Sequence, residues 1–401
     1  MPEYAYGDRI RQARILRQRK VTDLAERIDR PAPTLSKWER SRRVHLDENV
    51  LSILVEYLKV TPVFLATRPS PPMFDTDLLF KAPQTTLKRE INWLVEFVRL
   101  VSELLDWIDE RRRLPPVHIR LISRDGEDVL DAAQELRQVL GFRPAEPIDY
   151  LTHQVERAGI VVAVRRRSSA VGDLIAAADD TGSILKERHE GCSAWVGEFR
   201  ERPLVVMRGV DTWEKTRWVL AHELGHLSLH AGRSAVSEDA EEQASRFASE
   251  LLAPIRVISA ELPRVVTMAS LLEVKRRWGI SLAALIRHLH VNDVISTERR
   301  RTLYEQLYTR RNPETGRSFG VTEPGWNERA LERPRLIAAW LERVTGSRIP
   351  EAVSATTGIF PQDLLASILS EQRRAAHGNS GTSTQVHSRP ERNVIDMGRR
   401  H

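Results

Sequence analysis

The sequence has a single cysteine, Cys192, among its 401 residues. A lone cysteine excludes an internal disulfide, and it also excludes a zinc cluster built from several thiolates. Any metal site in this chain must therefore use histidine and carboxylate ligands. Because no paired histidine stands beside it to activate the thiol, Cys192 is expected to be a small buried apolar residue rather than a nucleophile.

Long apolar runs are also missing. No apolar stretch approaches the roughly 20 residues that a membrane-spanning helix needs, and the N-terminus lacks the basic stretch, apolar core and cleavage site of a secretory signal. With 41% hydrophobic and 29% charged residues, the composition is typical of a soluble globular protein. We therefore expect a cytoplasmic protein without a membrane partner, and its length predicts about two to four domains.

The net charge of +6 is unevenly distributed along the chain. Residues 1–68 carry 14 basic residues against nine acidic ones, so most of the excess positive charge lies in the first sixth of the sequence. Such an asymmetry predicts a polyanionic partner for the N-terminal segment.

The apolar pattern predicts a mainly helical α+β fold in five parts. Helical spacing over residues 7–66 indicates a compact unit of five short helices, and three prolines within residues 69–72 break the pattern after it. The expected parts are a helical N-terminal domain at 1–68, a linker and connecting helix at 69–120, a mixed domain with a small β-sheet at 121–257, a helical C-terminal region at 258–371 and a disordered tail at 372–401.

Strands are predicted in the first half of the mixed domain and helices in the second half. The segment GIVVAVRR at 159–166 is typical of a strand, and residues 193–208 resemble a β-hairpin. A long helix is expected next, with Asp211 and Glu214 in a capping arrangement at its start. A second helix is predicted over residues 237–252.

The long helix carries the motif H-E-x-x-H at His222, Glu223 and His226, within VLAHELGHLSLH. A spacing of four residues puts both imidazoles on one helix face, one turn apart, where both can bind a single zinc ion at about 2.0–2.1 Å. Glu223 stands beside the first ligand and can take a proton from the attacking water. The motif therefore predicts a zinc-dependent hydrolase.

The third metal ligand is predicted on the second helix. His230 continues the spacing of four, but it lies about 12 Å from His222 along a straight helix, so three such ligands cannot converge on one ion. We expect His230 to pack at the end of the helix. Glu241 shares a face with the small residues of the second helix, and packing through that face would direct its carboxylate at the metal. Glu242 and Glu238 remain alternatives.

These residues resemble the ImmA/IrrE family of zinc peptidases, through WVLAHELGHLSLH, the hairpin before it and E-x-x-A-S-x-F-A-S-E-L-L-A-P after it. The family is similar to gluzincins, which bind zinc through two histidines and one glutamate. The resemblance implies that His222, His226 and Glu241 bind zinc and that Glu223 is the catalytic base. The family usually has Asn, Asp or His where this chain has Ser245, a difference that concerns the support of Glu241.

Residues 7–66 resemble an XRE-type helix-turn-helix domain, through GDRIRQARILR, DLAERI and TLSKWER. The resemblance implies a recognition helix at about residues 32–40 that enters the major groove N-terminus first. Leu35 and Trp38 are expected to face the core. Asp29 stands where relatives usually have a turn glycine, and aspartate tolerates the left-handed conformation of such a turn. The candidate DNA contacts are Thr34, Ser36, Lys37, Arg40, Arg42 and Arg43.

These features together predict a DNA-binding zinc peptidase that makes limited cuts in a protein partner, which the resemblance implies is a transcriptional repressor or an antitoxin. The expected partners are double-stranded DNA through residues 1–68, the protein substrate, which the hairpin could bind along an edge strand, and a second copy in a homodimer. The alternative is a helix-turn-helix transcriptional regulator whose zinc domain is a sensor or a structural module. Glu223 favours catalysis, because a structural site needs no base beside its ligand. A protein-binding role for the N-terminal domain also stays open.

Overall fold

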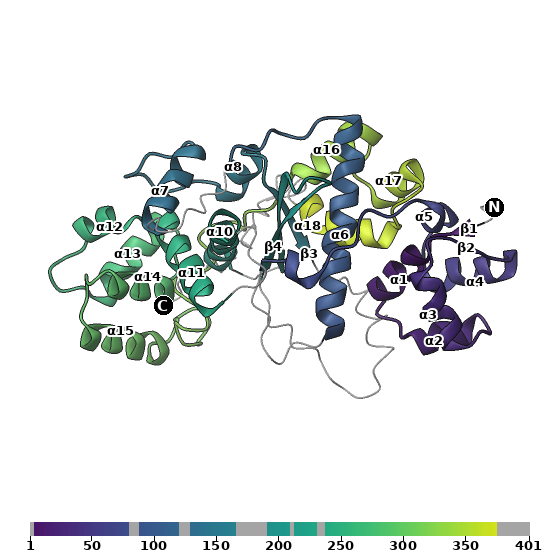
Figure 1. The fold of residues 1–401 in the computed structure, drawn as a ribbon. Coiled ribbons are helices and arrows are strands. Elements are labelled where there is room, and N and C mark those ends of the chain that lie inside the picture. Colours follow the sequence, from purple (N-terminus) through teal and green to yellow (C-terminus); the bar gives the residue numbers. More distant parts are fainter. Residues whose placement is uncertain are drawn as a thin grey trace, which may run out of the picture.

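A three-stranded β-sheet lies near the middle of the molecule, with helices on both of its faces (Figure 1). The computed structural model describes residues 4–79, 88–119, 129–165, 191–208, 212–230 and 237–374. The strands are β3 (Val161–Arg165), β4 (Gly191–Val196) and β5 (Arg202–Arg208), in the order β3-β5-β4. Strands β4 and β5 are antiparallel, which confirms the predicted hairpin, whereas β3 pairs in parallel with β5. The fold is α+β and mainly helical, as expected.

Each face of this sheet contributes to a different hydrophobic core, because successive residues of a strand point to opposite sides. Ala163, Cys192 and Val206 lie in the core shared with the N-terminal and C-terminal helices. Val162 and Val205 lie in the core that contains the helix with the H-E-x-x-H motif. Cys192 is buried, and burial raises the pKa of its thiol. This agrees with the expectation of an unreactive apolar residue.

Residues 7–66 form five short helices, as predicted. They are α1 (Gly7–Leu16), α2 (Val21–Arg27), α3 (Ala32–Arg40), α4 (Glu48–Leu58) and α5 (Pro62–Ala66). A short antiparallel pair of β1 (Tyr4–Ala5) with β2 (Val44–His45) was not predicted, because two residues are too few to show a period. Asp29 follows α2 with a φ of 51°, the left-handed conformation expected of it. Leu35 and Trp38 both pack in the core, also as expected.

Helix α6 (Lys88–Arg111) joins these N-terminal helices to the sheet, and the short 3-10 helix η1 (Asp75–Asp77) precedes it. Arginines and carboxylates pair across the contact of α1 with α6. The Arg9 guanidinium lies 2.5 Å from the Glu103 carboxylate, and that of Arg99 lies 2.6 Å from Asp8. Because both arginines are buried, removing either carboxylate would leave a buried charge without that partner, which is costly, so these pairs tie the position of α1 to that of α6.

The C-terminal helices return to the same core. They are α16 (Leu336–Thr345), α17 (Pro350–Thr357) and α18 (Gln362–Arg374), and they lie beside α6 and the sheet. Arg17 of α1 pairs with Asp363 of α18 at 2.7 Å, and the Thr61 hydroxyl donates to the Gly358 carbonyl at 2.7 Å. The division of the chain into five parts stays a prediction, and almost all of the expected tail at 372–401 falls outside the described residues.

The remaining helices cover the other face of the sheet and extend to the end of the molecule opposite the N-terminal helices (Figure 1). They are α7 (Val129–Val139), α8 (Leu151–Arg157), α10 (Trp213–Leu229), α11 (Glu238–Leu252), α12 (Ile255–Glu261), α13 (Met268–Trp278), α14 (Leu282–Val291) and α15 (Thr297–Thr309). In the part of the chain that the structure describes, no helix combines the length and apolar character that crossing a membrane requires.

A buried ion cluster holds the start of α10, where the sequence predicted a cap. Thr212 is the N-cap residue and forms no side-chain cap hydrogen bond, and Asp211 lies outside the described residues. The Glu214 carboxylate instead lies 2.9 Å from the Lys275 ammonium, which is also 3.1 Å from Glu323. The capping role predicted for Glu214 is therefore wrong: α10 begins after Thr212, and the Glu214 carboxylate binds a buried cation from α13 instead.

Candidate metal centre

Helices α10 and α11 approach each other closely because small residues line their contact. A Cβ at Gly225 would lie 3.1 Å from the Ala244 Cα, so a side chain larger than glycine would crowd α11. Ala244 and Ala248 are fully buried in the same contact. Ser237 caps α11 by accepting the backbone N–H of Ala240. The first turn of α11 thus lies against the motif helix.

Three side chains from these two helices converge. The Nε2 atoms of His222 and His226 are 3.1 Å apart. The Glu241 carboxylate lies 3.4 Å from each of them, through Oε2 to His222 and Oε1 to His226. A tetrahedral ion with bonds of about 2.0–2.1 Å has neighbouring ligand atoms about 3.3 Å apart. The two imidazole nitrogens are close to this spacing, whereas each 3.4 Å distance is to a different oxygen of Glu241. One ligand atom from each of the three residues lies within 4.8 Å of the other two, which is close enough for all three to bind one ion.

The other candidate ligands do not join this group. Glu242 is turned toward α14, where its carboxylate pairs with Arg287. The side chain of Glu238 lies outside the described part of the structure. His230 lies behind His226, with the two Nδ1 atoms 2.9 Å apart. His230 thus lies outside the group of three, and it contacts His226 through a polar ring nitrogen where only packing was predicted.

Burial and the two histidines act in opposite directions on the pKa of Glu241. Partial burial raises the pKa of Glu241, but the adjacent imidazoles of His222 and His226 lower it more, so its pKa lies below the ordinary range. His226 is 1% exposed and His222 12%. Trp218 stacks on His222 with the ring centroids 5.1 Å apart. The group therefore offers two largely buried nitrogens and one ionised carboxylate, a donor set that suits a divalent metal.

Glu223 lies between α10 and the sheet and is 4% exposed. Its Oε2 accepts a hydrogen bond from the Ser193 hydroxyl of β4 at 2.8 Å. Burial raises the pKa of Glu223, while His226, His222 and the Ser193 hydroxyl lower it. A carboxylate with a raised pKa takes up a proton more readily, which is the property that a general base needs.

Sequence reasoning missed Ser193, although a signal was present. Ser193 is a polar residue within the otherwise apolar strand GCSAWV, and such a residue in a buried strand needs a polar partner. Ser245, where the sequence departs from the family pattern, has its Oγ 3.5 Å from the Nδ1 of His222. This serine therefore faces a histidine of the group, whereas the sequence had associated it with Glu241.

The outer edge of β4 is partly occupied by the chain itself. Leu79 pairs with Ser193 in antiparallel fashion: its N–H donates to the Ser193 carbonyl at 2.7 Å, and the reverse bond measures 3.4 Å. Leu78 and Leu79 are both buried, one in each core. The stretch of edge that could receive another strand is therefore shorter than the sequence suggested.

The six predicted DNA-contacting residues lie in α3 and in the loop after it. Lys37, Arg40, Arg42 and Arg43 are exposed, and Thr34 and Ser36 are half-buried. The Arg43 guanidinium lies 4.4 Å from the centre of the Tyr4 ring and donates to the Tyr6 hydroxyl at 3.2 Å. Arg40 donates to the backbone carbonyl of Ser36 at 3.0 Å. Arg40 and Arg43 are thus held by neighbours within the N-terminal helices.

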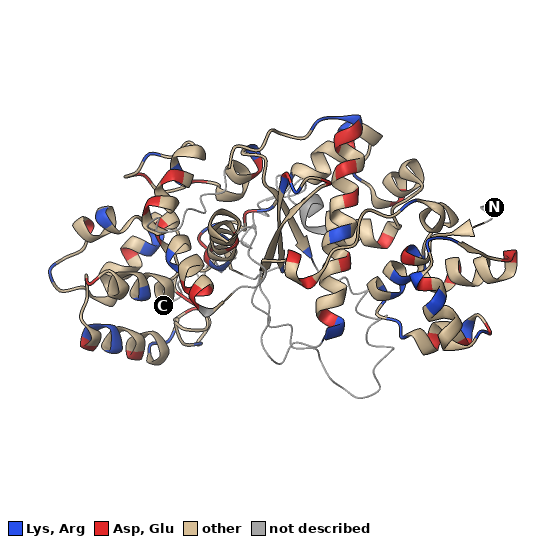
Figure 2. Cartoon of the chain, viewed as in Figure 1, with Lys and Arg blue, Asp and Glu red and all other residues tan. Residues whose placement is uncertain are grey.

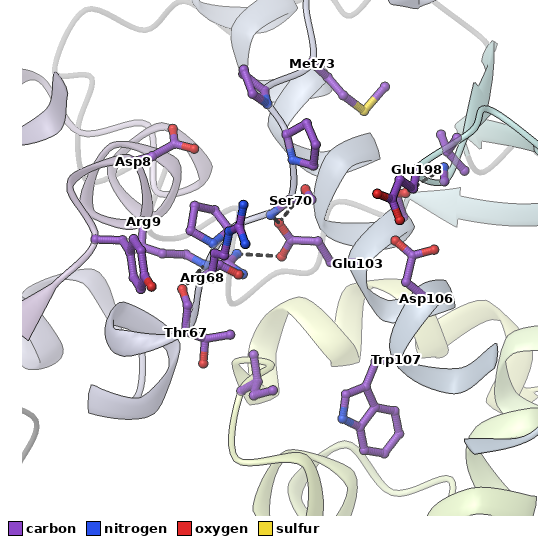
Figure 3. Close-up of a pocket in the computed structure, with 18 of the residues that line it drawn as sticks. Asp8, Arg9, Thr67, Arg68, Ser70, Met73, Glu103, Asp106, Trp107 and Glu198 are labelled. Carbon is purple, nitrogen blue, oxygen red and sulfur yellow. Dashed lines mark hydrogen bonds and ion pairs between the residues drawn. The ribbon is translucent and has the colours of Figure 1, made fainter. Parts of the chain in front are cut away.

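A cavity of about 1090 Å³ lies where the N-terminal helices meet α6 and the β4–β5 hairpin (Figure 3). Arg42, Glu103, Asp106 and Glu198 are among the residues that line it. Burial and the nearby carboxylates, led by that of Glu201, raise the pKa of Asp106 to about 6. None of the residues that converge at the histidines lines this cavity, so it is separate from the metal centre.

Comparison with known families concerns the segment that holds this centre. No curated protein sequence matches the chain. Residues 189–290 match the family model of the peptidase M78 family that is described as the IrrE N-terminal-like domain. The matched segment contains β4, β5, α10 and α11, and with them both histidines, Glu223 and Glu241. The match supports the resemblance to the ImmA/IrrE family for this quarter of the chain, and it points to a metallopeptidase.

Proposed function

We propose that this protein is a zinc-dependent peptidase that also binds DNA. The observation that carries the proposal is the convergence of His222, His226 and Glu241, close enough together to bind one ion, beside the buried carboxylate of Glu223. Two imidazoles and one carboxylate are a typical ligand set of catalytic zinc, which keeps a further position for water or substrate. A purely structural site would have no use for a base at Glu223.

Each residue of the centre has a definite role in this proposal. His222, His226 and Glu241 would hold the zinc, which would supply a Lewis acid for the scissile carbonyl. Glu223 takes a proton from the water that attacks the carbonyl carbon, and it passes that proton to the amine as the carbon–nitrogen bond breaks. The Ser193 hydroxyl binds one oxygen of Glu223 and so keeps the carboxylate in place for both transfers.

We expect the substrate to bind as an extended strand along the edge of β4. Leu79 occupies the position opposite Ser193, so we place the substrate along the remainder of this edge. Gly191 also lies next to Glu223, because a Cβ added to Gly191 would lie 2.7 Å from Oε1 of Glu223. Such a short edge suits a limited cut in one exposed segment, and the family resemblance suggests a transcriptional repressor or an antitoxin as the protein that is cut.

Gly191→Ala is expected to lower the rate of peptide hydrolysis by up to about 100-fold. A Cβ at this position would lie 2.7 Å from Oε1 of Glu223, so the base would have to leave its position against β4. The φ of Gly191 is not positive, so the backbone itself accepts alanine. Steady-state kinetics together with zinc titration would check this, and a wild-type rate or a loss of zinc would contradict it.

We further propose that residues 1–68 bind double-stranded DNA, with α3 as the recognition helix and a homodimer as the bound form. Basic residues outnumber acidic ones in this segment, and Figure 2 marks their positions along the N-terminal helices in blue. Lys37 and Arg42 are exposed at the end of α3 and just after it, where a phosphate contact requires no rearrangement of the core.

Lys37→Ala is expected to weaken DNA binding for all sequences alike and to reduce the slope of log K against log salt by about 1. Electrophoretic or fluorescence titrations at several salt concentrations would measure this slope. Arg89→Ala is a matched control, because Arg89 is exposed at the start of α6 and outside the proposed DNA-binding segment. An unchanged slope for Lys37→Ala, or an equal change for Arg89→Ala, would contradict the assignment.

The proposed function is tested by expressing the chain beside the products of its neighbouring genes and comparing wild type with Glu223→Gln. We expect a discrete fragment of one partner in the wild-type cells only, and equal binding of both forms to the same promoter DNA. Equal promoter binding with no such fragment would favour the alternative, a transcriptional regulator whose metal domain is a sensor or a structural module.

A further inference from the structure

The last turn of α10 places a third histidine behind the metal centre. His230 is completely buried, and each of its ring nitrogens has a partner. Its Nδ1 lies 2.9 Å from the Nδ1 of His226, and its Nε2 lies 3.0 Å from Oε1 of Gln243 on α11. The Gln243 amide in turn donates to Asp239 at 2.6 Å. A residue that only filled space would need neither polar partner.

We propose that His230 is a positioning residue that fixes the ring orientation and the tautomer of His226, at the inner end of a hydrogen-bond chain through Gln243 to Asp239. The inference rests on the proposed metal site, because it concerns the support of one of that site's ligands. These hydrogen bonds join the end of α10 to α11, the same two helices that supply all three candidate ligands.

The direction of every hydrogen bond in this series, from His226 through His230 and Gln243 to Asp239, follows from metal binding. The Nε2 of His226 faces His222 and Glu241, so this nitrogen must offer its lone pair to the metal. The single ring proton of neutral His226 is then on Nδ1 and is donated to the Nδ1 of His230. His230 must therefore carry its own proton on Nε2, which donates to the Gln243 carbonyl oxygen. The Gln243 amide group is left to donate to Asp239, as observed.

The same series of hydrogen bonds also joins α10 to α11. His230 is the C-cap residue of α10, whereas Asp239 and Gln243 lie in the first two turns of α11, on either side of Glu241. The bond from His230 to Gln243 thus holds the turn that carries Glu241 beside the turn that carries His226. By comparison, the outer nitrogen of His222 faces the Ser245 hydroxyl at the longer distance of 3.5 Å. His226 is consequently the ligand whose geometry is more firmly set.

His230→Leu and His230→Asn separate the hydrogen bond from the packing. Leucine fills the space but removes the acceptor, whereas the side-chain oxygen of asparagine lies close to the position of Nδ1 in histidine and can still accept from His226. Gln243→Leu breaks the chain one step further out, at a half-buried position that endangers folding less. His288→Leu is a matched control, because His288 is also buried and bonds the Ala253 carbonyl at 3.0 Å, away from the ligands.

Zinc dissociation constants of the full chain, measured by chelator competition, provide the test. We expect His230→Leu to bind zinc about 10- to 100-fold more weakly than wild type. Gln243→Leu should be weakened in the same direction but less. His230→Asn keeps the acceptor for His226 and loses the bond to Gln243, so it should be weakened no more than Gln243→Leu, whereas His288→Leu should stay close to wild type. The visible absorption of the cobalt-substituted protein should change in His230→Leu and be retained in His230→Asn. Long-range proton–nitrogen NMR of zinc-loaded protein should show the Nδ1–H tautomer of His226 and the Nε2–H tautomer of His230.

Three results would overturn the inference. Wild-type zinc affinity in both His230→Leu and Gln243→Leu would show that these hydrogen bonds do not support His226. Equal weakening in His230→Asn and His230→Leu would show that ring volume matters and the acceptor does not. The opposite tautomers would contradict the direction of the bonds. Failure of the wild type to bind zinc would instead remove the metal site itself and this inference with it, whereas absence of peptidase activity with tight zinc binding would leave the inference standing.

Discussion

Glu223→Gln is expected to lower kcat/KM for cleavage of the protein partner by about 10²–10⁴-fold, the usual contribution of a positioned general base. Glutamine keeps the volume of the side chain and can still accept the hydrogen bond of the Ser193 hydroxyl, but it cannot take up a proton. The variant should therefore retain its fold and its zinc. Because burial already disfavours the charged form of Glu223, a neutral amide at this site should not reduce stability.

Rate measurements at saturating zinc would check this expectation, with the zinc content of each preparation determined in parallel. Ser193→Ala is the matched comparison. It removes the hydroxyl that donates to the Glu223 carboxylate at 2.8 Å, but the carboxylate itself is still present. We expect its rate to fall less than that of Glu223→Gln. A Glu223→Gln protein that cleaves its partner at the wild-type rate would eliminate Glu223 as the base.

Glu241→Gln is expected to weaken zinc binding by more than about 100-fold, beyond the effect of changing a residue that only supports a ligand. The amide keeps one oxygen in the same position but lacks the negative charge that the ionised carboxylate offers to the metal. Activity should fall with the metal content and should partly return in excess zinc. That recovery separates this variant from Glu223→Gln, which added zinc should not restore.

The adjacent residue provides the control for this substitution. Glu242→Gln makes the same chemical change one position along α11, where the carboxylate pairs with Arg287 at the surface. Surface ion pairs contribute little, about 0–1 kcal/mol, so zinc affinity and stability should both stay near the wild-type values. If chelator competition showed equal losses for the two variants, or a larger loss for Glu242→Gln, the choice of Glu241 as the third ligand would be refuted.

Local patterns in the sequence were sufficient to predict most of the helices and the hairpin. The spacing of four residues in H-E-x-x-H places His222 and His226 on one face of any regular helix, whatever surrounds it. The small residues of the second helix indicated how closely it could approach, which is why Glu241 could be chosen over Glu242 before the packing was known. The left-handed conformation of Asp29 could also be predicted, because the conformation of a turn depends mainly on the turn residue itself.

Contacts between residues far apart in the chain could not be predicted in this way. Glu214 has the spacing of a capping residue, yet it binds Lys275, which lies 61 residues further along. Ser193 gave a weak signal as a polar residue in an apolar strand, but nothing in the sequence named Glu223 as its partner. The parallel pairing of β3 with β5, and the return of the C-terminal helices to the N-terminal ones, likewise join distant segments.

The difference between what could and what could not be predicted from the sequence has a physical cause. Helix and strand periods, turn residues and ligand spacing depend on neighbours within a few positions, so the order of amino acids alone specifies the fold class, the motif helix and its pair of imidazoles. Which carboxylate Ser193 binds, which imidazole His230 faces and which part of the β4 edge is paired with Leu79 depend on tertiary packing. In a buried site every polar group must find a partner from whatever segment packs beside it.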